Sequence, residues 1–161
     1  MGSPWCWIAG EQVNHALGVV PEWVPVHVED GEEVDRAEVE AAAARHSLSA
    51  VRWPATFPFD SRTAMLAATF AKQSGRVVAY SLAAMRQAFA AGRDLSETDN
   101  VLIAAAACEI HPRALLKGVE MRSVQAALAE ATAGAPERVP ALVGGGLSLV
   151  GAAALAGADV F

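Results

Sequence analysis

Apolar residues recur at helical spacing over most of the chain. Near the start, a stripe that includes Trp5, Ile8 and Val13 predicts a helix over residues 5–17, because one face of a helix repeats every three to four residues. Pro4 is harmless in the first turn of such a helix. Between residues 60 and 135 the same spacing predicts five helices in series. They are expected over 60–73, 78–91 and 101–108, from Pro112 onward, and around Val124, Leu128 and Ala131.

Strand patterns are confined to two regions. Residues 23–28 read Trp-Val-Pro-Val-His-Val, and aromatic and β-branched residues favour a strand there, with Pro25 indicating an edge or a bulge. Residues 138–143 and 147–150 flank a glycine run, which predicts an antiparallel hairpin. Residues 152–158 are at most a short terminal helix. The sequence therefore predicts an α/β protein.

The connecting segments are acidic or rich in proline. Residues 29–40 are rich in acidic residues and predict a solvated loop that enters a helix over 35–46. A surface role is favoured there over metal binding. Residues 52–59 contain two prolines, which exclude a helix because proline lacks an N–H and restricts its predecessor. The aromatic residues of this segment are expected to pack on the helices that follow.

Composition and charge exclude several classes of protein. The chain has 161 residues, 53% hydrophobic and 19% charged, which indicates one domain with a full core and excludes extensive disorder. With a net charge of -6 and 12 scattered Lys and Arg residues, we expect no nucleic-acid partner. Residues 139–158 are 20 uncharged residues, long enough to cross a membrane. Their proline, glycine and alanine content favours buried strands instead, so no membrane partner is expected.

The cysteine content also limits the possibilities. Two cysteines, Cys6 and Cys108, are too few for a disulfide scaffold or a zinc site, and no metal is expected. The low number suits a reducing compartment, and residues 1–20 lack the pattern of a secretory signal. We therefore expect a cytoplasmic protein. Cys108 follows a run of alanines, where a small buried core residue is the simplest interpretation.

The segment Ser3-Pro4-Trp5-Cys6 has the greatest chemical potential. A nucleophile at the start of a helix is stabilised as an anion by the exposed N–H groups and the helix dipole. A capping Ser and a buried Cys remain the open alternative. His15 and His27 are candidate bases or ligands, although a hydrogen-bonded structural histidine is the simpler interpretation of each.

Residues 3–9, Ser-Pro-Trp-Cys-Trp-Ile-Ala, resemble the active-site segment of the DsbA-like branch of the thioredoxin superfamily. That branch includes the Cys-Pro-x-Cys oxidoreductases and Ser-Pro-x-x proteins related to 2-hydroxychromene-2-carboxylate isomerase and kappa-class glutathione transferase. Residues 57–65 and 88–96 are similar to its helical insertion, and residues 139–143 to its cis-proline strand.

The resemblance implies an α/β, thioredoxin-like fold with an inserted, all-helical subdomain. Residues 57–135 would form the insertion, and residues 1–56 with 136–161 the thioredoxin-like part. Only Met1 and Gly2 precede Ser3, so the first strand of the family is expected to be missing.

Roles for individual residues also come from the resemblance. Ser3 matches the attacking Cys of the dithiol members and the Ser that acts on the glutathione sulfur in the others, and Cys6 matches the resolving Cys. Both are the predicted catalytic residues. The predicted substrate-binding residues are Pro4, Trp5, Asp60, Ser61, Val139 and Pro140, with a cis peptide bond before Pro140.

Three functions follow as hypotheses. The first is a DsbA-family thiol-disulfide oxidoreductase homologue in which Ser-Pro-Trp-Cys replaces the dithiol, so that no disulfide can form within the motif. The alternative is a glutathione-dependent isomerase or transferase that uses Ser3. The second alternative is a non-catalytic scaffold that binds a partner. A homo-oligomer is a separate candidate assembly. The expected substrate is a thiol or disulfide, either a peptide or glutathione. Glutathione is the candidate cofactor, and no covalently bound cofactor is expected.

Overall fold

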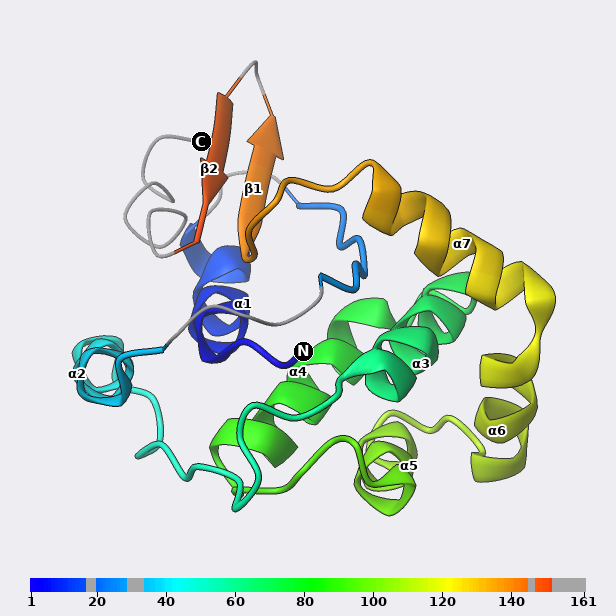
Figure 1. Cartoon of the computed structure of the whole chain (residues 1–161), viewed down its shortest axis with the longest axis horizontal. Helices are drawn as coiled ribbons and strands as arrows, with labels where there is room; N and C mark the ends of the chain where they lie inside the picture. Colours follow the sequence, from blue (N-terminus) through cyan, green and yellow to red (C-terminus); the bar gives the residue numbers. More distant parts are fainter. Residues whose placement is uncertain (17–19, 29–33, 145–146, 152–161) are drawn as a thin grey trace.

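The computed structural model describes residues 1–16, 20–28, 34–144 and 147–151. Helices make up most of this part of the chain (Figure 1). They are α1 (Pro4–Ala16), α2 (Arg36–Arg45), α3 (Arg62–Gln73), α4 (Val77–Phe89), α5 (Thr98–Ala106), α6 (Pro112–Glu120) and α7 (Arg122–Ala133). The five helices predicted in series are confirmed as α3 to α7.

The centre of the helical part is α3, which packs against α4, α5, α6 and α7. Its neighbour α4 also contacts α1 and α5, so that α4 joins the start of the chain to the other helices. Gly75 and Gly92 follow α3 and α4 with φ of 71° each. Glycine adopts this left-handed conformation without a steric penalty, which is why it commonly ends a helix.

A capped helix follows the acidic segment, close to the predicted range. The Asp35 carboxylate accepts hydrogen bonds from the N–H groups of Ala37 and Glu38 at 2.9 and 3.3 Å. These bonds satisfy donors that the first turn of α2 leaves without a partner, and the negative charge suits the helix dipole. On its inner face, Val39, Ala42 and Ala43 are buried, and α2 packs against α1.

The predicted hairpin is confirmed as β1 (Ala141–Gly144) and β2 (Leu147–Val150), which pair antiparallel with Ala141 opposite Val150. Gly144 belongs to β1, whereas the sequence placed it in the turn. Within the described ranges, the sheet has these two strands. Residues 152–158, predicted as a short helix, lie outside the described residues.

The predicted strand over residues 23–28 is wrong. The segment contains no strand, because its hydrogen bonds go elsewhere. Pro25 has no N–H to donate, and the His27 N–H donates to the Thr132 Oγ1 on α7 at 3.0 Å. The segment is also tied to α3 by an ion pair between Glu22 and Lys72 at 2.7 Å. Side chains from α7 and α3 thus bind this part of the chain in place of a neighbouring strand.

The aromatic residues after residue 52 pack on the helices as predicted. Phe89 of α4 is fully buried and has four aromatic neighbours, at ring-centroid distances of 6.1 to 6.3 Å. They are Trp7, Trp53, Phe57 and Phe59. Such tilted and edge-on pairs add to the stabilisation from buried area. We call these five residues the aromatic cluster. It joins α1 and the extended segment to α4.

Among the described residues, no helix combines the length and the apolar content that a transmembrane segment requires.

Candidate active site

Ser3 immediately precedes α1, and Pro4 is its first residue, the position where a proline fits because that N–H has no partner within the helix. The Cys6 N–H donates to the Ser3 carbonyl at 3.1 Å, so the polypeptide already turns into the helix at Ser3. Both side chains are partly buried, while Pro4 is buried and Trp5 packs against the core. The motif therefore presents a hydroxyl and a thiol at one helix terminus.

Cys6 is the third residue of α1 and is not in a disulfide. At this position a thiolate gains from the positive end of the helix dipole. The residue before α1 is Ser3, which carries a hydroxyl and no thiol, so the start of α1 has the single thiol of Cys6.

Cys108 does not lie in a helix, which corrects its predicted setting. It follows the end of α5 and is only partly buried. Burial raises the pKa of its thiol, and the nearby charge of Arg76 opposes that shift. The Arg76 guanidinium also donates to the Cys108 carbonyl at 2.5 Å. α5 packs against α3, α4 and α6, whereas α1 packs against α2 and α4. Cys6 thus lies within α1, whereas Cys108 follows the end of α5.

The peptide bond between Val139 and Pro140 is cis, the form that the resemblance implies. Pro140 lies directly before β1, and its carbonyl accepts the Gly151 N–H at 2.7 Å, which closes the base of the hairpin. In the part of the chain that the structure describes, no hydrogen bond involves Val139. Both residues are half-buried. Figure 1 shows the start of β1 and α1 on the same side of the molecule.

Asp60 and Ser61 have structural roles at the start of α3. The Asp60 carboxylate accepts the N–H of Arg62 at 2.8 Å. Ser61 occupies the N-cap position without a side-chain capping bond, and it is buried. Asp60 thus satisfies a backbone donor at the start of α3.

Glu11 fixes the orientation of α1 against α4. Its carboxylate accepts two hydrogen bonds from Arg86 at 2.6 Å each and one from Trp7 Nε1 at 3.1 Å. The hydrogen bond from Arg86 is the largest cause that lowers the pKa of Glu11, aided by the charge of Arg86 and the bond from Trp7, while burial opposes the shift.

A lowered pKa in the folded state means that Glu11 stabilises the fold above the pKa of an unfolded carboxyl and ceases to do so as pH falls through the folded-state pKa. We therefore expect Glu11→Gln to destabilise the protein at neutral pH and to have little effect at acidic pH. Urea unfolding at both pH values would measure this, with exposed Glu130 changed to Gln as the control. Equal destabilisation at both pH values would show that charge is not involved.

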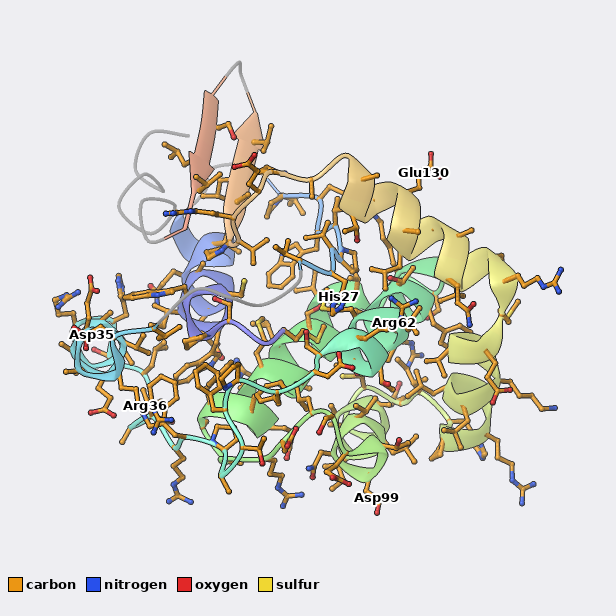
Figure 2. The ribbon with its side chains drawn as sticks, in the orientation of Figure 1. His27, Asp35, Arg36, Arg62, Asp99 and Glu130 are labelled. Carbon is orange, nitrogen blue, oxygen red and sulfur yellow. The ribbon has the colours of Figure 1, made fainter. Side chains whose placement is uncertain are left out.

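A pocket of about 520 Å³ lies apart from the predicted site residues. None of them lines it. The residues that line it include Arg62, His27, Thr132, Gln125, Leu128 and Glu137. Figure 2 shows His27 and Arg62 close together in the view, near α3 and α7. The Nδ1 atom of His27 is buried without a hydrogen-bond partner, so the interpretation of His27 as a hydrogen-bonded structural residue is wrong for its ring.

No local sequence pattern predicts this pocket, because residues distant in the chain form it. As for metals, no group of three or more His, Cys, Asp or Glu residues within the described ranges is arranged to hold an ion.

In a comparison with solved structures, the chain is similar to a structure described as 2-hydroxychromene-2-carboxylate isomerase, with a TM-score of 0.80 and 12% sequence identity. The similarity covers 96% of this chain and 86% of the isomerase chain. No protein-family model matches the sequence. A sequence search of curated proteins also finds no match. The likeness to this solved structure shows that the chain has an α/β, thioredoxin-like fold.

Proposed function

We propose that the chain is a glutathione-dependent isomerase or transferase in which Ser3 binds the glutathione sulfur. The observation that carries this proposal is the single sulfur at the start of α1, since Ser3 precedes the helix and Cys6 is not in a disulfide. A dithiol mechanism needs a second thiol near Cys6, and Cys108 follows the end of α5, a helix that packs against α3, α4 and α6. The similar solved structure is described as an isomerase, which adds support.

Glutathione suits the groups present at this end of the molecule. Val139 is half-buried and has no hydrogen bond in the described structure, so its backbone is available to pair with the backbone of an extended peptide. The start of α1 adds the positive end of a helix dipole, which favours an anionic sulfur. Val139 would bind the peptide backbone, and Ser3 would donate its hydroxyl hydrogen to the sulfur.

The chemistry assigned to Ser3 is the stabilisation of a thiolate. A hydrogen bond to the charged form lowers the pKa of a bound thiol, and its proton is released to solvent. The thiolate then adds to the electrophilic carbon of a conjugated carbon–carbon double bond of the substrate. A carbon–sulfur bond forms, the π bond breaks, and its electron pair moves onto the conjugated carbonyl oxygen as an enolate, which takes up a proton from solvent in a transferase and expels the sulfur again in an isomerase. A transferase keeps this bond in the product. In an isomerase the bond breaks again after the substrate rearranges, so glutathione is regenerated.

We expect glutathione to bind the full chain at millimolar concentration, with the pKa of its thiol lowered on binding. Calorimetry measures the affinity, and the ultraviolet absorbance of the thiolate against pH measures the pKa. Ser3→Ala is expected to raise the pKa of the bound thiol by about one to two units, since a hydrogen bond to a charged group contributes about 1.5–3 kcal/mol. Exposed Ser123 changed to Ala is the matched control. Absence of binding in the unmodified protein would refute the proposal.

A thiol-disulfide oxidoreductase that uses Cys6 is the second candidate. It is favoured by the reduced, partly exposed Cys6 in the first turn of α1. In this reaction the Cys6 thiolate attacks glutathione disulfide, a mixed disulfide forms, and one glutathione thiolate leaves and takes up a proton. Mass spectrometry of the folded protein after incubation with glutathione disulfide would detect the mixed disulfide. Cys108→Ser should keep it and Cys6→Ser should lose it, whereas an unmodified Cys6 would exclude this candidate.

If neither experiment finds an interaction with glutathione, the non-catalytic scaffold is the hypothesis that stands.

A further inference from the structure

The pocket beside α7 is a second place where a small molecule can bind. It is formed by residues 27–28, the start of α3, one face of α7 and residues 135–137. Its volume of about 520 Å³ falls within the range of ligand sites, roughly 300–1,000 Å³. None of the residues in the proposed function lines it.

Its wall carries a cation whose side chain is not used by the fold. The Arg62 guanidinium makes no ion pair or hydrogen bond in the part of the chain that the structure describes, although its backbone N–H binds Asp60. Guanidinium presents donors in a planar fork that matches a carboxylate. His27 and Arg62 both line the pocket, and their labels lie close to one another in the view of Figure 2. The Nδ1 atom of His27 is buried and has no hydrogen-bond partner within the described ranges, so the fold does not use its hydrogen-bonding capacity.

The position of His27 is fixed by α7. Its N–H donates to the Thr132 hydroxyl at 3.0 Å, and that hydroxyl donates to the Leu128 carbonyl at 2.7 Å. Thr132 therefore uses its hydroxyl to hold His27 in place. Because His27 is held before any ligand arrives, less ordering is required on binding.

The rest of the wall is mostly apolar. Leu128 is buried, and Ala129 and Ala133 extend the same surface along α7. Val28 and Pro136 add apolar surface from the two connecting segments. A ligand that places a hydrocarbon group here removes apolar area from water, which favours binding.

We propose that this pocket binds a small organic acid whose carboxylate pairs with Arg62, with His27 beside it, and whose apolar body lies on α7. This goes beyond the proposed function and does not depend on it. Glu137 is the other charged group on the wall and limits the charge of the ligand. One cation beside one carboxylate suits a monoanion better than a dianion such as phosphate, which also lacks an apolar body.

The first experiment titrates the full chain with phenylacetate and, separately, with phenylacetamide, followed by calorimetry and by NMR of the imidazole nitrogens. We expect phenylacetate to bind and to shift the His27 resonances. The neutral amide is expected to bind at least about tenfold more weakly, because the charge-assisted pair with Arg62 is lost. Equal binding of acid and amide, or stronger binding of inorganic phosphate, would overturn the carboxylate assignment.

Three variants locate the site. Arg62→Gln is expected to weaken phenylacetate binding about tenfold, whereas Arg122→Gln, an equal charge change on α7 away from the pocket, should leave it unchanged. Ala129→Trp, on an exposed position of α7, fills the pocket and should abolish binding, with circular dichroism to show that the fold is kept. If Arg62→Gln and Arg122→Gln behave alike, or if Ala129→Trp still binds, the proposed site is wrong.

Glu137 gives a further check on the charge of the ligand. Glu137→Gln removes a repelling carboxylate and should strengthen phenylacetate binding. Weaker binding in this variant would contradict the proposal.

Discussion

Phe89→Ala is expected to destabilise the protein by about 3–5 kcal/mol, the usual cost of removing a fully buried phenylalanine. The ring is 0% exposed and has four aromatic neighbours from α1 and the extended segment. Those neighbours cannot all move into the space, because Trp7 belongs to α1 and the Phe89 carbonyl also accepts the Arg52 N–H at 2.7 Å. Urea unfolding followed by tryptophan fluorescence measures the change.

Phe89→Leu is the matched variant for this prediction. It keeps most of the volume and loses the ring, so a smaller loss than that of Phe89→Ala is expected, about 1–2 kcal/mol. If both variants unfold at the same urea concentration as the unmodified protein, the aromatic cluster does not hold α1 and the extended segment on α4.

Gly118→Ala is expected to destabilise the protein by about 1–3 kcal/mol, although alanine is the better helix former. Gly118 is buried in α6. A Cβ atom there would lie 2.6 Å from Phe70 Cγ and 2.7 Å from Cε2, closer than carbon atoms approach without displacement. The ring cannot simply withdraw, because α3 is packed against α4, α5 and α7 as well as α6.

A double-mutant cycle tests the cause. If contact with the Phe70 ring produces the loss, Phe70→Leu in the Gly118→Ala background should restore part of the stability. An unchanged or increased urea midpoint for Gly118→Ala alone would contradict the close approach of α6 and α3.

Much of the helical structure could be predicted from spacing and from residues that end helices. The prediction was less successful for which residues are buried. In α4 the helical spacing of Val78, Leu82, Met85 and Phe89 marks these four residues as one apolar face. Tyr80 and Ser81 are nevertheless buried, whereas Val78 and Leu82 are only partly buried. The reason is that α4 contacts α1, α3 and α5, so more than one of its faces is covered. Burial raises the pKa of Tyr80, with the charge of Cys108 as a smaller cause.

The candidate site was only partly predictable. Ser3, Pro4 and Cys6 are adjacent in sequence, so their place at the start of α1 follows from local rules. Pro140 lies before a strand as the resemblance implies, and its peptide bond is cis. The pocket with Arg62 and His27 was not predictable, because residues 27, 62 and 128 come from three distant segments.

The sequence by itself determined the helices, the hairpin and the single sulfur at the start of α1, because capping, periodicity and turn residues act between near neighbours in the chain. Only the tertiary structure decided that residues 23–28 bind helices instead of forming a strand, and that Arg62 and His27 share a pocket. A hydrogen bond such as that from His27 to Thr132 joins residues far apart in the chain. Local patterns carry no information about such a partner.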